Sequence, residues 1–197
     1  MKVVAFNCSP RRDGNTCHMI KDVLRILESG GIETEMVQVG GHDLHGCRAC
    51  GSCARTKDMR CIMDDDMLNT CVQKIVAADG VIIGSPTYFS DVTSETKALI
   101  DRAGYVIRMN GIPTKRKVGA AIVAVRRAGA VHTFNTINQF FTINEMIVVG
   151  SSYWNLSVAW KEGDYEKDAE GVRTMKDLGE NMAWLLEKIG GKSNCPP

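Results

Sequence analysis

Short apolar runs alternate with helical stripes along this 197-residue chain, and that alternation is the feature that most limits its fold. The runs predicted to be strands are residues 2–7, 33–39, 80–84, 118–125 and 146–149. Between them, apolar residues recur three or four positions apart, as at Ile20, Val23 and Leu27, which is typical of a helix packed on one face. Strands separated by helices predict a parallel sheet with helices on both faces. We therefore expect a doubly wound α/β fold with the strand order 2-1-3-4-5.

The length of the chain is that of one α/β domain, and the sequence contains no internal repeat, low-complexity tract or linker. The clearest predicted helix lies near the C-terminus, where the apolar residues from Met175 to Ile189 form one stripe. We expect the domain to occupy residues 1–192 and residues 193–197 to form a loose tail.

The charge of the chain is almost balanced, with 24 basic and 23 acidic residues. This balance argues against a nucleic-acid partner and against an anionic membrane surface. No apolar run approaches the ~18 residues of a membrane span, and the segment from Met1 to Phe6 lacks the length and cleavage site of a signal peptide. We therefore expect a cytoplasmic protein. In that reducing compartment, eight cysteines indicate metal or redox chemistry rather than disulfides.

A polar loop, residues 9–16, follows the first predicted strand and leads into a helix. Backbone N–H groups and the helix dipole favour an anion at such a position, and a phosphate monoester fits it. The alternative is an ordinary turn in which Asn15 or Thr16 caps the helix. The loop has neither the GxGxxG nor the GxxxxGK[ST] pattern, which argues against a Rossmann NAD site and against a P-loop.

Two further loops follow the third and fourth predicted strands. Residues 84–93 carry the adjacent aromatics Tyr88 and Phe89, and residues 126–133 carry two arginines beside small residues. In the order 2-1-3-4-5 the first and third strands flank the switch point, so that their loops open onto one crevice. A ligand with a phosphate and a flat ring would lie there. Taken alone, the aromatics could equally cap the core and the arginines could be solvated.

The first two loops carry a family resemblance. Ser9-Pro-Arg-Arg-Asp-Gly-Asn-Thr16 resembles the phosphate loop of the NADPH-dependent FMN reductase group of flavodoxin-like proteins. Gly84-Ser-Pro-Thr-Tyr-Phe89, continuing through Lys97-Ala-Leu-Ile-Asp-Arg102, is similar to their isoalloxazine loop and following helix. The resemblance runs over nearly the whole chain and implies a flavodoxin-like fold that binds FMN. It also implies a homodimer or homotetramer with flavins near the subunit interfaces.

The resemblance also assigns cofactor-binding residues. It implies that Ser9, Arg11, Asn15 and Thr16 bind the phosphate, and that Pro86, Thr87, Tyr88 and Phe89 contact the ring. In the third loop the candidates are Arg126, Arg127 and Gly129. This loop matches less well, because Ala130 stands where the family often has a second glycine.

Residues 40–63 interrupt the alternation and form a cysteine-rich insert after the second strand. Cys47, Cys50 and Cys53 have the spacing CxxCxxC, and Cys61 follows them. Repeated short spacings of this kind are typical of thiolates that converge on one inorganic centre, whereas a structural zinc site usually pairs two CxxC motifs across a longer gap. The segment resembles the compact cluster motif of iron-sulfur flavoproteins, which implies a [4Fe–4S] cluster on these four cysteines. Zinc and redox-active free thiols remain as alternatives.

Other chemically capable residues have ordinary interpretations as well. Cys71 lies on a predicted helix face and is expected in the core. The acidic residues 64–66 are expected to complement a helix dipole rather than to bind a cation. Tyr153, Trp154 and Trp160 border a flavin or a subunit interface, or they cap the core.

Together these features predict an FMN-dependent oxidoreductase that passes electrons between FMN and a [4Fe–4S] cluster. No side chain is predicted to act as a catalytic acid, base or nucleophile. The redox partner stays open among NAD(P)H, ferredoxin and a quinone-like acceptor. The alternatives are a metal-free NAD(P)H-dependent FMN or quinone reductase, a non-catalytic flavodoxin-type electron carrier, and a zinc-stapled binding module. Because the insert leaves the carboxyl end of the second strand, we expect the cysteine site and the flavin at one edge of the sheet.

Overall fold

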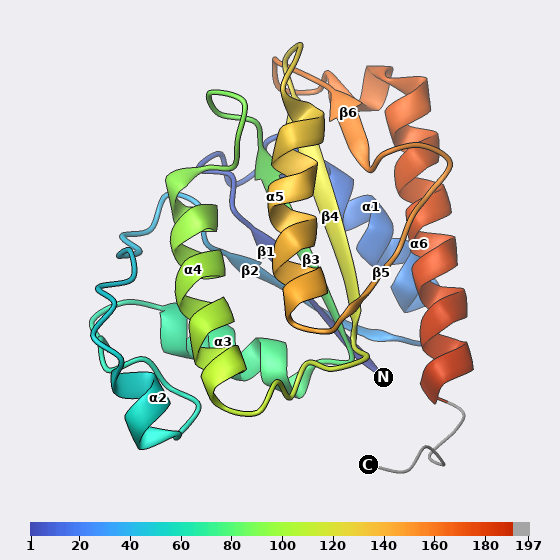
Figure 1. The fold of residues 1–197 in the computed structure, drawn as a ribbon. Coiled ribbons are helices and arrows are strands. Elements are labelled where there is room, and N and C mark those ends of the chain that lie inside the picture. The colour runs from blue at the N-terminus through green and yellow to red at the C-terminus, as the bar shows by residue number, and fades with distance from the viewer. Residues whose placement is uncertain (191–197) are drawn as a thin grey trace.

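A computed structural model describes residues 1–190 and shows a twisted sheet between two layers of helices (Figure 1). The strands are β1 (Lys2–Asn7), β2 (Glu33–Gln38), β3 (Gly80–Pro86), β4 (Val118–Val125), β5 (Ile147–Val148) and β6 (Leu156–Val158). All strand pairs are parallel, and the order is β2-β1-β3-β4-β5 with β6 also paired to β4. The predicted flavodoxin-like order is therefore confirmed.

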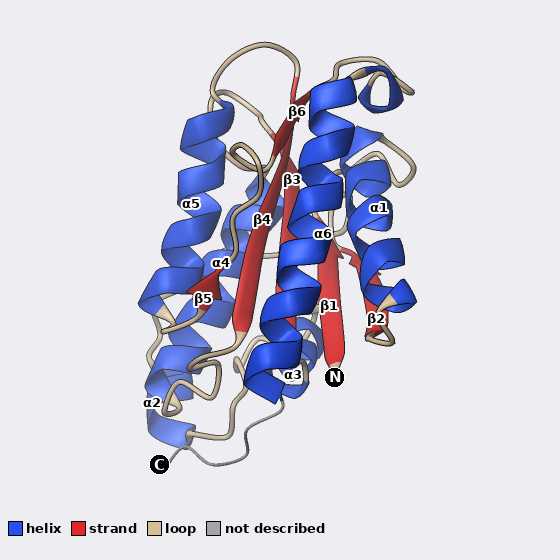
Figure 2. Ribbon diagram, turned by 90° about the vertical axis from the view of Figure 1, so that its right-hand side faces the viewer, coloured by secondary structure: helices blue, strands red, loops and turns tan. Residues whose placement is uncertain are grey.

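Helices cover both faces of the sheet, as the alternation predicted. They are α1 (Asn15–Ser29), α2 (Ser52–Thr56), α3 (Leu68–Ala77), α4 (Ser94–Met109), α5 (Ala130–Ile143) and α6 (Ala169–Gly190), with a short 3₁₀ helix, η1 (Tyr165–Lys167). Figure 2 shows α1 and α6 on one side of the sheet and α4 and α5 on the other.

The side chains of the strands alternate between two apolar cores. In β1, Val4 and Phe6 belong to the core beneath α3, α4 and α5, whereas Val3 and Ala5 belong to the core beneath α1 and α6. Strand β4 is buried along its whole length. Burial on both faces explains why β3 and β4 are continuous apolar runs in the sequence rather than alternating ones.

At one edge of the sheet, the predicted fifth strand is shorter than expected and β6 was not predicted. Strand β5 has two residues instead of the expected 146–149, and β6 pairs with Val123–Val125 farther along β4. Strands this short carry too few residues to show a period in the sequence. Helix α5 was also not predicted, because its sequence is rich in threonine, asparagine and phenylalanine, which have modest helix propensity.

The C-terminal helix confirms the predicted stripe from Met175 to Leu186, since Met175, Leu178, Met182 and Leu186 are all buried, whereas Ile189 at its end is exposed. The expected domain boundary at residue 192 and the expected tail, residues 193–197, lie outside the described residues. No helix within residues 1–190 is both long enough and apolar enough to cross a membrane.

The Asp168 carboxylate connects β6 to the start of α6. Its Oδ2 accepts hydrogen bonds from the Ser157 hydroxyl at 2.7 Å and from the Val158 N–H at 3.0 Å. Its Oδ1 accepts one from the Gly171 N–H at 3.1 Å, in the first turn of the helix. Burial opposes the charge on Asp168, yet these donors hold the pKa of Asp168 below its ordinary value.

We expect Asp168→Ala to lower the free energy of unfolding by about 1–2 kcal/mol at neutral pH, because the helix cap is lost. A carboxylate with a depressed pKa stabilises the fold above its unfolded pKa of about 3.9, and this stabilisation is lost as the pH falls through the lower folded pKa. The difference in unfolding free energy between wild type and variant, measured with urea, should therefore begin to shrink below about pH 4 and continue to shrink as the pH falls further.

The matched control is Glu180→Ala on the same helix. Glu180 forms an exposed ion pair with Lys176 at 3.7 Å, so that this variant should lose less than about 0.5 kcal/mol. Equal losses in the two variants would contradict the role of Asp168.

Candidate functional site

A cleft of about 220 Å³ opens at the edge of the sheet where β1, β3 and β4 end. The segments after all three strands line it, as does the segment after β6. The predicted residues that line it are Ser9, Arg11, Asn15, Thr16, Pro86, Thr87, Tyr88 and Arg126. Gly14, Ala124, Ala159 and Trp160 complete the lining. The predicted convergence of three loops is therefore present in the structure.

The start of α1 provides a place for an anion at this cleft. None of the described side chains caps the helix, and its first turn contains no acidic residue. The N–H groups of a first helical turn have no partner within the helix, and the helix dipole adds positive potential there. The guanidinium of Arg11 adds a full positive charge to the same lining. A phosphate group fits these donors.

Contacts with three neighbouring segments hold the loop before α1 in place. The Asn7 Oδ1 accepts a hydrogen bond from the Ser9 N–H at 3.2 Å. The Thr93 hydroxyl, at the start of α4, donates to the Cys8 carbonyl at 3.0 Å. Gly40 lies so close that a Cβ would stand 2.2 Å from the Ser9 carbonyl carbon, so that only glycine fits there. The loop is therefore positioned before any ligand binds.

The loop after β3 presents its two aromatic residues differently. Tyr88 and Asp91 exchange backbone hydrogen bonds of 2.8 and 3.0 Å, and the turn between them has positive φ at Phe89 and Ser90. This turn carries the Phe89 side chain fully into solvent, while Tyr88 lines the cleft. Phe89, predicted at the ring, is thus not brought into the cleft of a single chain.

The loop after β4 divides between two cavities. Arg126 lines the cleft, and its guanidinium lies 4.1 Å above the centre of the Trp160 ring. Arg127 and Gly129 instead line a neighbouring cavity of about 510 Å³ together with Trp154. Several roles were open for three further aromatic residues. Trp160 borders the cleft, whereas Tyr153 and Trp154 line the second cavity.

Asn15 and Arg11 also hold the segment that follows β6. The Asn15 amide donates to the Lys161 carbonyl at 2.9 Å and accepts from the Tyr165 N–H at 3.3 Å. Arg11 donates to the Trp160 carbonyl at 3.3 Å. These two predicted phosphate residues therefore position the fourth wall of the cleft, of which only Trp160 was a candidate in the sequence because β6 was not predicted.

The four cysteines of the insert line one pocket, although they come from different turns of the chain. Cys47, Cys50, Cys53 and Cys61 share it with Arg102, Tyr105 and Val106 of α4. Ala49 and Gly51 adopt left-handed conformations, with φ of 51° and 68°, which turn the chain so that the CxxCxxC cysteines face the same side. All four are free thiols.

Hydrogen-bonding groups surround three of the four sulfurs. The Ala49 N–H donates to Cys47 Sγ at 3.4 Å, and Arg102 donates to Cys61 Sγ at 3.5 Å. The Ser52 hydroxyl, 3.5 Å from Cys50 Sγ, lowers the pKa of Cys50 together with the Ser52 N–H. Burial raises the pKa of Cys53, and the neighbouring thiols Cys61 and Cys47 add to that effect. A positively charged centre would offset this like-charge repulsion between thiolates.

Two asparagines, one buried and one half-buried, hold the cysteine-bearing loops, and neither was among the residues predicted from the sequence. Asn69 accepts from the Cys61 N–H at 2.7 Å and donates to the Cys61 carbonyl at 2.9 Å. Asn110 donates to the Cys53 carbonyl at 3.3 Å and accepts from the Met59 N–H at 3.1 Å. In the sequence, only the spacing of the cysteines indicated this site. An asparagine whose side chain bonds to backbone groups has no distinctive sequence pattern.

The sulfurs of the described cysteines form no compact group of three. Four thiolates bound to one zinc at 2.3 Å lie about 3.8 Å apart in a tetrahedron. Within the described part of the chain, no three cysteine sulfurs lie within 4.8 Å of one another. In a [4Fe–4S] cluster the cysteines need not converge on one atom. Four thiols that line one pocket are a donor set that could hold a [4Fe–4S] cluster.

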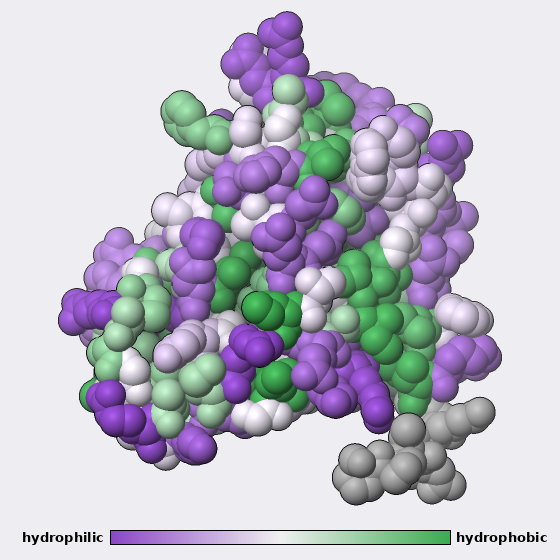
Figure 3. Space-filling view, in the orientation of Figure 1, coloured by the Kyte–Doolittle hydropathy of each residue, from purple (hydrophilic) through white to green (hydrophobic). Residues whose placement is uncertain are grey.

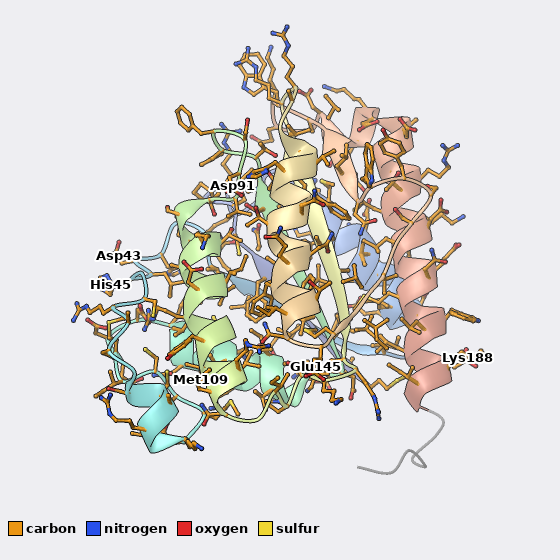
Figure 4. All side chains as sticks on the ribbon, viewed as in Figure 1. Asp43, His45, Asp91, Met109, Glu145 and Lys188 are labelled. Atoms are coloured by element: carbon orange, nitrogen blue, oxygen red, sulfur yellow. The ribbon has the colours of Figure 1, made fainter. Side chains whose placement is uncertain are left out.

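The position of the cysteine site corrects the expectation that it shares an edge of the sheet with the flavin. The insert leaves β2 at that edge but descends along α4, and α2 lies at the opposite end (Figure 1). Figure 4 shows Asp91 near one end of α4, and Met109 at its other end beside α2. From Thr93 to the pocket residues Arg102 and Val106, the separation along the helix axis is about 14–20 Å.

Comparison with known proteins agrees with this geometry. Residues 1–161 match the family described as NADPH-dependent FMN reductase. An iron-sulfur flavoprotein of Methanocaldococcus jannaschii is 34% identical over 196 residues, which cover 96% of this chain and 99% of that protein. An iron-sulfur flavoprotein of Methanosarcina thermophila is 32% identical, with 96% and 97% of the two chains covered. The chain belongs to the iron-sulfur flavoproteins of the NADPH-dependent FMN reductase family.

Two solved structures have a fold similar to that of this iron-sulfur flavoprotein. RosB, with a bound formylated riboflavin phosphate intermediate, has a TM-score of 0.73 at 20% identity, covering 98% of this chain and 82% of its own. An NAD(P)H:quinone oxidoreductase from Methanothermobacter marburgensis has a TM-score of 0.69 at 12% identity, covering 92% and 96%. At these identities the likeness shows the flavodoxin-like fold. Family membership makes FMN-dependent oxidation–reduction the function class of the chain.

We expect the double substitution Arg11→Ala, Thr16→Val to weaken FMN binding at least tenfold. Hydrogen bonds to a charged phosphate are worth about 1.5–3 kcal/mol each, and both side chains line the cleft at the start of α1. Fluorescence titration of the apoprotein with FMN measures the affinity.

Arg12→Ala is the matched control, because Arg12 is the adjacent arginine but is exposed and does not line the cleft. It should bind FMN like the wild type. Unchanged affinity in the double variant would remove the phosphate from this position.

Proposed function

We propose that this chain is an FMN-dependent oxidoreductase that also holds a [4Fe–4S] cluster on Cys47, Cys50, Cys53 and Cys61 and exchanges electrons between the two cofactors. The observation that carries the proposal is the convergence of these four free thiols on one pocket in a chain that also forms the flavin cleft. The name carried by its relatives, iron-sulfur flavoprotein, agrees with it.

The two cofactors would complement each other. FMN can take up two electrons and release them singly, and an iron–sulfur cluster carries one at a time. The residues of the chain would supply binding and electrostatics: the start of α1 and Arg11 would hold the phosphate, while Tyr88 and Trp160, which line the cleft, would lie beside the ring. Arg126 would stabilise negative charge on a reduced ring from its position over Trp160.

The separation of the two sites within one chain favours transfer between subunits. The cysteine pocket lies about 14–20 Å along α4 from the end of the helix that borders the flavin loops. Aromatic side chains beside the flavin cleft are exposed, among them Phe89 and Trp154. Figure 3 shows a further apolar region between α5 and α6, where Figure 1 places β5, and Ile147 of β5 is exposed. These surfaces support a homodimer or homotetramer in which one subunit's cysteine site approaches another subunit's flavin.

The electron donor would be NAD(P)H or a ferredoxin-type protein, and a quinone-like molecule is a candidate acceptor. The family description favours NADPH. The alternative that keeps the same cleft is a metal-free FMN or quinone reductase, in which the cysteines serve only as thiols.

We expect serine at any of the four pocket cysteines to reduce the iron content per chain by at least half. Each substitution removes one thiolate ligand from the proposed cluster. The measurement is iron and acid-labile sulfide analysis of protein purified without oxygen.

Cys17→Ala and Cys71→Ser are the controls, because both thiols are buried away from the pocket. They should keep the iron of the wild type. Loss of iron in Cys71→Ser with retention in Cys61→Ser would show that the fourth ligand is wrong, and a wild-type protein without iron would leave the metal-free reductase.

Electron exchange between the cofactors can be observed directly. We expect that, after rapid anaerobic reduction of the flavin, cluster absorbance bleaches as flavin absorbance returns. The same experiment on the Cys53→Ser variant should show flavin reduction alone. Two independent signals in the wild type would disprove the exchange while leaving the flavin reductase activity in place.

A further inference from the structure

Arg102 is a buried cation in the wall of the cysteine pocket. Its side chain and that of Asp66 are each only 1% exposed, and the two form an ion pair. Arg102 stands on α4, whereas Asp66 belongs to the segment that leads from the insert into α3. No other ion pair of the described residues has both partners buried to this degree.

The guanidinium directs its remaining donors at the insert. It donates to the His45 carbonyl at 3.1 Å and to the Met63 carbonyl at 3.1 Å, one on each limb of the insert. It also donates to Cys61 Sγ at 3.5 Å. Its Nε is buried without a partner among the described residues. Figure 4 shows His45 on the outer limb of the insert, beside α4.

These contacts do more than a salt bridge requires. Because the side chain is only 1% exposed, the donors that do not pair with Asp66 cannot point to solvent, and one of them meets a sulfur that is a candidate cluster ligand. The reduction potential of a cluster depends on hydrogen bonds to its sulfurs, on nearby charge and on solvent exposure. A cation with little water around it acts strongly over such a distance.

We infer that Arg102 is a positioning residue that raises the reduction potential of the cluster, through its N–H···S bond to Cys61 and its buried positive charge, with Asp66 limiting the size of the effect. The inference rests on the proposed cluster. Gaining an electron makes the cluster more negative, so that a nearby cation and donor stabilise the reduced form. Asp66 opposes this stabilisation because its carboxylate neutralises most of the guanidinium charge.

A purely structural role for the pair predicts something different. If Arg102 only fastens the insert, loss of either partner loosens the same contact, and the two losses should act in the same direction. If the pair sets the potential, removing the positive partner and removing the negative partner should shift it in opposite directions. The sign of the two shifts therefore separates the interpretations.

The experiment is a spectroelectrochemical titration of the cluster in the purified, FMN-loaded protein, with iron content measured on the same samples. We expect Arg102→Gln to shift the oxidised-to-reduced equilibrium at least tenfold toward the oxidised form, which is about 59 mV lower for one electron. Asp66→Asn should shift it toward the reduced form. Arg102→Lys, which keeps the charge but not the planar set of donors, should fall between wild type and Arg102→Gln.

Arg60→Gln is the matched control. Arg60 precedes Cys61 and forms an ion pair with Asp64 at 3.0 Å, but both side chains are exposed, so that its charge is screened by water. Its potential should equal that of the wild type.

The outcomes separate the inference from the proposed function. A wild type without iron overturns the cluster itself. A wild type with a cluster whose potential is unchanged in Asp66→Asn and Arg102→Lys, or moves in the same direction in both, overturns the role of Arg102 alone. Should Arg102→Gln fail to assemble the cluster, the opposite shifts in Asp66→Asn and Arg102→Lys still decide the question.

Discussion

The buried ion pair between Arg102 and Asp66 joins the cysteine-rich insert to the flavodoxin-like domain. Removing one partner of such a pair costs about 3–5 kcal/mol, because the other charge is left without compensation. Burial opposes the charge on Asp66, but Arg102 and the N–H groups of His45 and Leu68 hold the pKa of Asp66 below its ordinary value. The N–H of Leu68 belongs to the first residue of α3. The pair therefore sets both the start of that helix and the path of the insert.

The path of the insert follows from the parallel sheet. A chain that leaves β2 at the carboxyl edge must return to the opposite edge before β3 can begin, because parallel strands need a crossover. Helix α3 has ten residues and is shorter than α1, which has fifteen. The insert therefore covers much of the distance between the two edges of the sheet, and it does so alongside α4 (Figure 1). The cysteines consequently lie at the far end of α4, and the flavin cleft lies at its near end.

The two sites share α4 as a common support. Its N-cap residue, Thr93, donates a hydrogen bond to Cys8 just before the phosphate loop, and its C-cap residue, Asn110, binds the Cys53 carbonyl. Arg102 lies between them. The single helix α4 thus positions the phosphate loop of the flavin cleft and also forms one wall of the cysteine pocket. The electron transfer between subunits that we propose would be compatible with this rigid separation.

The sequence by itself determined the strand order and the identity of the converging loops. Buried strands such as β3 and β4 are apolar throughout, and polar residues that follow them necessarily meet at one edge of a parallel sheet. The spacing of Cys47, Cys50 and Cys53 identified a common pocket because a short spacing limits how far apart the thiols can lie. Local chain length and periodicity carry this information, so that no tertiary contact was needed.

Only the tertiary structure decided where the cysteine pocket lies and what surrounds it. Arg102, Asn69 and Asn110 meet the insert from helices that follow it in the sequence, and contacts over such separations leave no local pattern. The same holds for β6, whose three residues become a strand by pairing with β4 and thereby bring Trp160 to the flavin cleft. Phe89 points into solvent because the turn between Tyr88 and Asp91 requires left-handed backbone at that residue, a conformation that its side-chain chemistry does not reveal.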